Sequence, residues 1–429
     1  MLQAILSSSA ETVVEVGPGA APLRARVIDP SLFTIPYCEA LVTALDEAGV
    51  DVQLVGRPLR AGEMPLRTPF DPRFYRWSDT LPRRIGKTGA ALKALEHCAD
   101  LASLAVRGLP GGSVAHFQWL PFPMADSVGL RLCRARGPVV VTVHDTTPFN
   151  GTPTSRLQLH GFIAALGLAD RLIVHTQTGL EQLVASGLDR RRIRCIPHGP
   201  LGGFGDIPPP PRSGPMTLVV FGKIRPYKGI DILIAALAAL GPDERRMLRV
   251  IIAGEPMMDV APLQARIVSD GLGGTVELRL GHLDEAAMRA LFTEAEGFVF
   301  PYREIEASGV LFLVQGLGRW LIASRLGAFA ETISHGETGR LVPSEDVPAL
   351  TAALLECVHS RPRPVGTVPV TGWDSIARAT IATYREAFLH WRGGRAASPK
   401  GLRAATAAAR AELASTAPVR PTSLLRGDP

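Results

Sequence analysis

The chain has 429 residues, of which 46% are hydrophobic, and its mean hydropathy is +0.16. This length exceeds what one hydrophobic core usually serves, and the composition is typical of a folded protein rather than a disordered one, so two domains are expected. No apolar run reaches the roughly 18 residues that span a bilayer, and the N-terminus lacks a basic region followed by an apolar core. Both features predict a cytoplasmic location.

The net charge of +6 comes from two stretches of the chain. Residues 71–95 hold six Lys or Arg against two Asp or Glu, and residues 393–429 hold the same numbers. Neither stretch carries a recognisable nucleic-acid-binding motif, so no nucleic-acid partner is predicted.

The first half of the chain alternates between short β-branched runs and helix-length segments. An early helix is expected over residues 38–48. Strands are expected near residues 26–28, 52–55, 114–117, 139–143, 171–175 and 192–196. Near-continuous apolar strands of this kind are typical of a parallel sheet that helices cover on both faces.

A Gly-rich and Pro-rich segment at 199–216 interrupts this alternation, because four consecutive prolines at 208–211 form neither helix nor central strand. A second alternating series follows, with strands expected near residues 217, 249, 276, 297 and 321. The predicted organisation is an N-terminal domain over 1–200, a linker over 201–216, a C-terminal domain over 217–372, a helix over 373–392 that packs back on the N-terminal domain, and a basic flexible tail over 393–429.

Residues 222–229, Gly-Lys-Ile-Arg-Pro-Tyr-Lys-Gly, stand between an apolar strand and an amphipathic helix. The first N–H groups of a helix lack partners within it and carry the positive end of the peptide dipoles. Together with Lys223 and Lys228, they predict a site for a phosphate group. An ordinary turn with two surface lysines is the alternative.

Ligands of open parallel sheets bind beyond the carboxyl ends of the strands. Five strand ends carry polar residues or glycines: His144 with Asp145, His198, the Lys223–Lys228 loop, Gly254 with Glu255, and the segment 301–309. These ends are expected to lie at the same edge of their sheets.

The motifs at these strand ends resemble the family-four, or group 1, glycosyltransferases of the GT-B fold. The donor loop of that family reads Gly-Arg-x-x-x-x-Lys-Gly, and residues 222–229 are similar, with lysine at 223 in place of arginine. His144-Asp145-x-x-Pro148 resembles the histidine motif of the first domain. Residues 327–342 resemble the family's Gly-Gly-x-x-Glu and Gly-x-x-Gly-x-Leu-Val segment. The resemblance implies two Rossmann-like doubly wound α/β domains that face a central cleft.

The resemblance also implies roles for individual residues. His144, Asp145 and Glu306 are the expected catalytic residues. Glu306 would accept hydrogen bonds from sugar hydroxyls of the donor. The expected donor-binding residues are Gly222, Lys223, Lys228, Gly229, His198, Gly254, Glu255, Glu304, Ser308, Gly309 and Val310.

One departure from the family pattern lies in its pair of glutamates, which stand eight residues apart. Glu306 fits the first position, with Glu304 as the competing choice, but the second position holds Val314, flanked by Leu313 and Gln315. A structural carboxylate at a helix start is the alternative role for Glu306. A structural role also remains open for His144 and for His198, whose ring can satisfy nearby backbone groups.

The expected activity is transfer of a sugar from a nucleoside-diphosphate sugar to a saccharide or lipid-linked saccharide acceptor, with retention of configuration as in the family. No Asp-x-Asp motif follows a strand, so no metal cofactor is expected. The basic and aromatic stretch over 73–87 suggests contact with an anionic membrane surface, against the alternative of a solvated helix face. A catalytically degenerate subunit that supports a partner glycosyltransferase and a GT-B sugar-nucleotide epimerase are the other readings.

Overall fold

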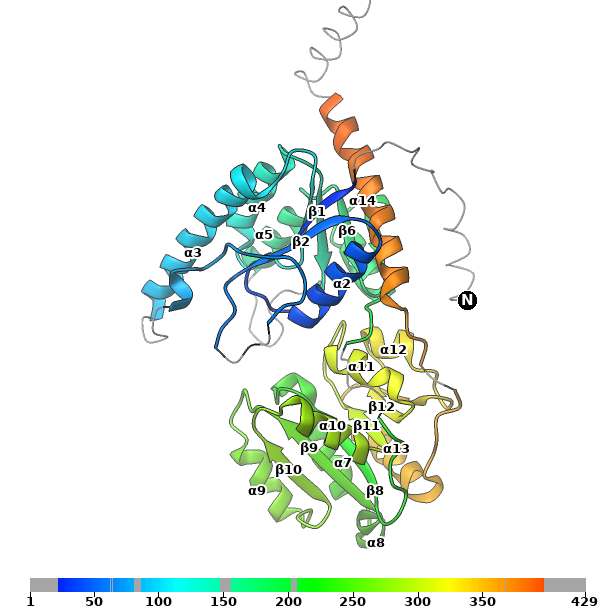
Figure 1. Cartoon of the computed structure of the whole chain (residues 1–429). Helices are drawn as coiled ribbons and strands as arrows, with labels where there is room; N and C mark the ends of the chain where they lie inside the picture. Colours follow the sequence, from blue (N-terminus) through cyan, green and yellow to red (C-terminus); the bar gives the residue numbers. More distant parts are fainter. Residues whose placement is uncertain are drawn as a thin grey trace, which may run out of the picture.

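The computed structural model describes residues 22–61, 63, 65–80, 86–146, 156–201, 207–366 and 368–396. Within these residues the strands form two sheets, one of seven and one of six strands. Every strand pair in both sheets is parallel. The two domains built on these sheets lie one above the other in Figure 1.

The sheet of the first domain is covered by helices on both faces. Its strands, in spatial order, are β3 (Phe70–Pro72), β2 (Asp51–Gly56), β1 (Arg24–Asp29), β4 (Val114–Phe117), β5 (Val139–Val143), β6 (Arg171–Val174) and β7 (Ile193–Cys195). One face packs against α2 (Ile35–Glu47). The other packs against α3 (Gly86–Ser103), α4 (Pro123–Arg134), α5 (Arg156–Leu166) and α6 (Gln177–Ala185). Short helical turns lie at η1 (Ser78–Thr80), η3 (Leu104–Gly108) and η4 (Arg190–Arg192).

The second domain repeats this plan. Its strands, in spatial order, are β10 (Val276–Leu280), β9 (Leu248–Gly254), β8 (Met216–Phe221), β11 (Gly297–Phe300), β12 (Trp320–Ser324) and β13 (Gly339–Val342). One face carries α7 (Ile230–Ala238), α9 (Ala261–Ser269) and α13 (Val347–Ser360). The other carries α10 (Glu285–Glu294), α11 (Gly309–Val314) and α12 (Gly327–Thr332). The remaining short elements are η5 (Pro226–Lys228), α8 (Pro242–Arg246) and η6 (Gln315–Leu317).

The last described helix, α14 (Trp373–Ala396), returns to the first domain and runs along it in Figure 1. Its apolar side joins the core that α2 forms with the sheet, through Ile376, Ala377, Tyr384 and Ala387. Polar contacts fix it there. Glu386 accepts a hydrogen bond from Arg171 (3.1 Å), and Trp391 Nε1 donates to the Arg134 carbonyl (2.7 Å).

The strand order reverses once in each sheet, between β1 and β4 in the first and between β8 and β11 in the second. At such a point the two flanking loops leave toward opposite faces, and the crevice between them is where open α/β sheets bind ligands. The fold therefore predicts a ligand site at the carboxyl end of each parallel sheet, beside its strand-order reversal.

The predicted fold class, two doubly wound α/β domains, is confirmed by this architecture. Helix α2 begins three residues earlier than expected, because Pro36 lies in its first turn, where proline needs no hydrogen-bond partner. The edge strands β3 and β13 were not expected. They have three and four residues and contain Pro72 and Gly339, so they lack the apolar runs of the central strands. Residues 202–206 of the predicted linker and 397–429 of the predicted tail lie outside the described residues.

Gly229 joins η5 to α7 in a conformation that favours glycine. Its φ is +63°, and an added Cβ would overlap the carbonyl oxygen of Pro301. We expect Gly229→Ala to lower the free energy of unfolding by about 2 kcal/mol or more, because a left-handed backbone and a backbone overlap both oppose the new methyl group. Urea unfolding measures this. Gly273→Ala, at a glycine with open space around it, is the matched control and should change stability by less than about 0.5 kcal/mol. Equal stability of the two variants would contradict the strain at Gly229.

Candidate active site

A cavity of about 850 Å³ lies between the two domains. The first domain contributes residues that follow β1, β4 and β5, and the second contributes residues that follow β8 and β11. Residues from the first domain include Ser31, Phe33, Lys93, Gln118, Trp119, Phe122, His144, Asp145 and Phe162. Residues from the second domain include Lys223, Arg225, Tyr227, Lys228, Tyr302, Ser308, Gly309, Val310 and Leu313. Residues beside both strand-order reversals therefore line the same cavity.

Lys228 is a buried cation at the wall of this cavity. Only 4% of it is exposed, and its Nζ donates to the carbonyl of Phe221 (3.0 Å) and lies 5.4 Å from the centre of the Tyr302 ring. Burial, with a smaller contribution from Arg225, lowers the pKa of Lys228 from 10.5 to about 8. A buried ammonium with one neutral acceptor is incompletely compensated, so an anion in the cavity would stabilise it.

The loop around Lys228 is held by backbone contacts at Gly222 and Gly254. A Cβ on Gly222 would lie 2.8 Å from Lys228 Nζ, and one on Gly254 would overlap the Gly222 carbonyl. The Glu255 carbonyl accepts a hydrogen bond from Ile224 N (2.8 Å), which pairs the loop with the end of β9. Gly222, Gly229, Gly254 and Glu255 thus shape the loop and do not line the cavity.

The start of α11 forms a second part of the wall. Ser308 is buried, and its hydroxyl accepts a hydrogen bond from Leu311 N (3.4 Å) at the helix start. Ser308, Gly309 and Val310 all line the cavity, on the same side as Lys228.

Glu306 does not line the cavity in this structure. Its Oε2 instead accepts hydrogen bonds from the backbone N (2.5 Å) and the hydroxyl (2.6 Å) of Thr146 in the first domain. Burial raises the pKa of Glu306, and the two bonds from Thr146 oppose this shift. The expected contact with donor hydroxyls is replaced here by an interdomain contact, because the 301–309 loop brings the carboxylate to the segment after β5. The competing residue, Glu304, is exposed and also lies outside the lining.

A second glutamate of the same domain makes a similar contact. Glu331 in α12 accepts hydrogen bonds from Gln177 N (2.9 Å) and from both the backbone N (2.9 Å) and the hydroxyl (2.8 Å) of Thr178. These groups form the N-terminus of α6, where a carboxylate is favoured by the unpaired N–H groups and the helix dipole. Glu306 and Glu331 therefore form interdomain hydrogen bonds that hold the second domain against the first.

His144 stands at the end of β5 and lines the cavity. Its ring stacks on Trp119, with centroids 5.0 Å apart, and lies edge-on to Tyr37 at 4.9 Å. Burial, with the nearby His175, lowers the pKa of His144 well below 6.5, so the ring is neutral at pH 7. Asp145 also lines the cavity. Burial raises the pKa of Tyr227 on the opposite wall, and the charge of Asp145 adds to this shift.

His198 lies away from the cavity lining, at the junction of the domains. Its ring stacks on Phe312 of the second domain, with centroids 4.0 Å apart, and its Nδ1 lies 2.6 Å from the Gly199 carbonyl. Burial lowers its pKa well below 6.5. In this structure His198 therefore packs as a neutral ring between the domains. It is not among the residues that line the cavity beside Lys223 and Lys228.

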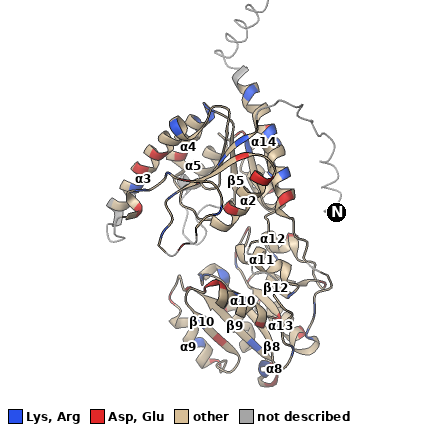
Figure 2. Cartoon of the chain, in the orientation of Figure 1, with Lys and Arg blue, Asp and Glu red and all other residues tan. Residues whose placement is uncertain are grey.

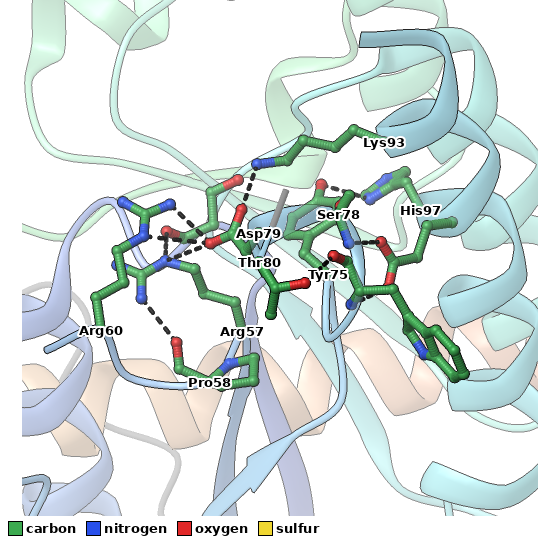
Figure 3. A network of polar contacts seen from close by, with 12 residues as sticks. Arg57, Pro58, Arg60, Tyr75, Ser78, Asp79, Thr80, Lys93 and His97 are labelled. Carbon is green, nitrogen blue, oxygen red and sulfur yellow. Dashed lines mark hydrogen bonds and ion pairs between the residues drawn. The ribbon is translucent and has the colours of Figure 1, made fainter. Parts of the chain in front are cut away.

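A polar network in the first domain includes Lys93, which lines the cavity (Figure 3). Asp79 accepts from Lys93 Nζ (3.0 Å) and Arg60 Nη2 (2.7 Å), and Arg57 lies 3.7 Å away. Lys93 also lies 4.3 Å from the centre of the Tyr75 ring. The ammonium that reaches the cavity from α3 is thus held by a carboxylate and an aromatic face.

Comparisons with known proteins agree with this arrangement. A family model described as a glycosyl transferase 4-like domain matches residues 34–199, and one described as glycosyl transferases group 1 matches residues 215–360. Each half of the chain, and each side of the cavity, is therefore matched by its own model. The chain belongs to the group 1 glycosyltransferases.

Curated relatives of this group 1 glycosyltransferase include enzymes named for mannosyl transfer. It is 30% identical over 247 residues to a phosphatidyl-myo-inositol mannosyltransferase of Mycolicibacterium smegmatis, covering 54% of this chain and 59% of the relative. It is 28% identical over 179 residues to a GDP-mannose:glycolipid 4-beta-D-mannosyltransferase of Xanthomonas campestris, covering 40% of this chain and 49% of the relative. The chain thus spans about half to three fifths of the length of these relatives.

Solved structures show the same fold at low identity. HepE of Anabaena, solved with UDP and glucose, has a TM-score of 0.61 and 14% identity, covering 90% of this chain and 100% of its own. Sucrose-phosphate synthase of Thermosynechococcus elongatus has a TM-score of 0.59 and 18% identity, covering 91% and 100%. These likenesses confirm the predicted GT-B fold of the glycosyltransferase.

The place of the family's second glutamate is apolar in this glycosyltransferase. Leu313 lines the cavity, Val314 is buried in the core beside it, and Gln315 is buried at the start of η6. The departure seen in the sequence therefore falls at the cavity wall, which Leu313 lines with an aliphatic side chain.

Several residues at the site were not singled out from the sequence: Gln118, Trp119, Thr146, His175, Arg225 and Tyr227. Gln118 and His175 follow β4 and β6 directly, so the strand-end rule that selected His144 applies to them too. Arg225 and Tyr227 lie within the 223–228 loop that the same rule selected, but neither was named as a site residue. Thr146 had no such signal, because its contact with Glu306 depends on how the two domains meet.

Replacement of Lys228 offers a test of the buried charge. The unfolded lysine keeps its proton up to about pH 10.5, whereas the folded one loses it near pH 8, so stability rises with pH between these values. We therefore expect Lys228→Met to raise the free energy of unfolding at pH 7 by about 1–3 kcal/mol, with a gain that disappears toward pH 10.5. Chemical unfolding at several pH values measures this.

The matched control is Lys223→Met, because Lys223 is exposed on the same loop. It should shift stability by less than about 0.5 kcal/mol at every pH. A clear loss of stability in Lys228→Met at pH 7 would show that Lys228 serves the fold rather than a ligand.

Proposed function

We propose that this protein transfers a sugar from a nucleoside-diphosphate sugar to a saccharide or lipid-linked saccharide, in polysaccharide or glycoconjugate biosynthesis. The buried Lys228 carries this proposal. It lies on the same wall as Lys223, Arg225 and the start of α11, and all of them line the cavity. The leaving nucleoside diphosphate gains negative charge in the transition state, and preorganised cations in a water-poor site stabilise that charge.

No metal ion is needed in this proposal, because Lys228, Lys223 and Arg225 supply the positive charge. Among the described residues, no group of three or more His, Cys, Asp or Glu side chains is placed to hold a metal ion. We also propose retention of configuration, as expected from the family. His144 and Asp145 would then face the reacting sugar from the first domain.

The acceptor would lie against the first domain, whose wall of the cavity includes four large aromatic side chains. Phe33, Trp119, Phe122 and Phe162 line it, with Lys93 and Ser31 as polar neighbours. Such a wall suits an acceptor that combines sugar rings with an apolar part. The names of the two mannosyltransferase relatives, which specify phosphatidyl-myo-inositol and a glycolipid, support a lipid-linked acceptor and a mannose donor.

We further propose that the protein works at the inner face of the cell membrane, as a peripheral protein. Within the described chain no helix is both long and apolar enough to cross a bilayer. The exposed residues of α3 in the segment 91–103, however, carry no charge: they are Ala91, Leu92, Leu95, Cys98 and Ala99.

Neighbouring elements extend this apolar surface. Met124, Val128 and Leu132 repeat every four residues on α4 and are exposed, and Leu159 is exposed on α5. The last turn of α4 carries Arg131 and Arg134. The ribbon of α4 has blue, basic segments in Figure 2. An apolar stripe with flanking arginines suits the interface of an anionic membrane. The stretch 81–85 lies outside the described residues.

The donor is tested by a screen of sugar nucleotides for binding and for release of free nucleotide, without and with soluble or lipid-linked acceptors. Wild type should bind a GDP-sugar or UDP-sugar and release its nucleotide in the presence of an acceptor. Lys228→Met should turn over on the order of a hundredfold more slowly, because it removes a transition-state charge contact. Turnover near the wild-type rate in this variant would refute the role of Lys228.

The same screen separates the other readings. Binding without transfer to any acceptor would favour a degenerate subunit, to which the apolar Leu313 also points. Conversion of the donor without an acceptor would favour an epimerase. No binding of any nucleotide would overturn the proposal.

Membrane contact is tested by flotation with vesicles that contain anionic lipid, at low and moderate salt. We expect wild type to float and Leu95→Glu to float less, because a carboxylate replaces an apolar side chain that is 69% exposed on α3. Val268→Glu, at a valine 77% exposed on α9 of the second domain, is the matched control and should float like wild type. If wild type does not float in either salt condition, the membrane proposal fails.

A further inference from the structure

Both ring nitrogens of His144 already have partners within the protein. Nδ1 lies 3.1 Å from His175 Nε2, and Nε2 lies 3.1 Å from the side-chain oxygen of Gln118. Gln118 and His144 both line the cavity, whereas His175 lies behind them. Nε2 of His144 therefore contacts a residue that lines the cavity, whereas Nδ1 contacts one that does not.

The partner of His175 Nδ1 determines which ring nitrogens carry protons in this series of hydrogen bonds. His175 Nδ1 is 3.0 Å from the backbone carbonyl of Ile196, and a carbonyl only accepts. The proton of His175 is therefore on Nδ1. Burial lowers the pKa of His175 to about 4, so the ring is neutral and its Nε2 accepts. His144 must then donate from Nδ1, and its Nε2 carries a lone pair.

A lone pair on His144 Nε2 needs a donor, and Gln118 has one. Its side-chain nitrogen lies 3.2 Å from His116 Nε2, on the other side of the amide. Half a turn of the carboxamide exchanges its oxygen and nitrogen without moving another atom. The amide then donates to His144 Nε2 and accepts from His116 Nε2.

The contacts of His116 complete the chain consistently. With its proton on Nε2, His116 shares that one N–H between the Thr142 hydroxyl (2.7 Å) and the Gln118 oxygen, and its Nδ1 accepts from the Tyr384 hydroxyl (2.8 Å). Tyr384 belongs to α14, and its ring is buried. Every buried polar atom in the series from the Ile196 carbonyl to Tyr384 then has a partner of the right kind.

We propose that Gln118 is a positioning residue that, together with His175, holds His144 as the neutral Nδ1–H tautomer with its Nε2 lone pair at the cavity wall. A hydroxyl of a substrate could then donate to this nitrogen only by sharing or displacing the Gln118 amide. The last helix of the chain takes part through Tyr384 and His116. The role in transfer rests on the proposed function, whereas the tautomer of His144 does not.

The titratable groups around His144 come from four elements. They are His116 at β4, His175 after β6, His198 after β7 and Tyr37 on α2, with Asp145 next in the chain. A carboxylate in place of the Gln118 amide would be a new anion at Nε2 that can only accept. It would favour the imidazolium form of His144.

The direct test is the ¹⁵N NMR spectrum of histidine-labelled protein, with His144 assigned by its loss in His144→Phe. Wild type at pH 7 should show His144 protonated on Nδ1 and unprotonated on Nε2. In Gln118→Glu the titration midpoint of His144 should rise by at least two pH units. Wild-type His144 protonated on Nε2 would overturn the proposal, and so would an unchanged midpoint in Gln118→Glu.

Two milder variants keep the test open if Gln118→Glu does not fold. Gln118→Met and Tyr384→Phe preserve shape and remove the amide or the hydroxyl. We expect Gln118→Met to lower kcat at least tenfold and Tyr384→Phe several-fold, with the Kd of nucleoside diphosphate changed less than twofold in both. Unchanged kcat in Gln118→Met would contradict the positioning role. If wild type binds no nucleoside diphosphate, the proposed function fails, and the NMR result still decides the tautomer.

Discussion

The buried ammonium group of Lys228 is the interaction on which the arrangement of the cavity depends. Lys228 is brought to the end of β8 by a loop that needs glycine at 229, and it leaves water for a place with one carbonyl partner. A cation in that position costs stability unless an anion joins it. The surrounding architecture makes room for such an anion, because both sheets end at the cavity and both strand-order reversals lie there. The strand order of the two sheets therefore determines where the cavity lies.

Contacts between the domains shape the cavity from outside. Two carboxylates of the second domain, Glu306 and Glu331, accept hydrogen bonds from Thr146 and from the start of α6. Helix α14 begins after the second domain and packs on the first, where Tyr384 contacts His116. The site thus has cationic side chains on the second domain and several aromatic side chains on the first, and it depends on the relative placement of the domains.

Much of this was readable in the sequence. Apolar strands, the proline-rich break and the ordered motifs predicted two doubly wound domains, and the strand-end rule located His144 and the Lys228 loop. The contacts of Glu306 and His198 were not predictable, because each lies where the domains meet and local sequence says nothing about that packing. Edge strands β3 and β13 were missed since their short segments contain Pro72 and Gly339. Gln118 was missed although it follows a predicted strand, because a neutral amide carries no obvious chemistry by itself.

Lys228 is proposed to bind a nucleoside diphosphate, and its own titration tests this binding most directly. With Lys228 assigned by comparison with Lys228→Met, NMR of labelled lysine side chains should give a pKa of about 8 in the free protein. Saturation with GDP or UDP should raise this pKa by one unit or more, because the diphosphate stabilises the ammonium. An unchanged pKa of Lys228 in the saturated complex would contradict the account.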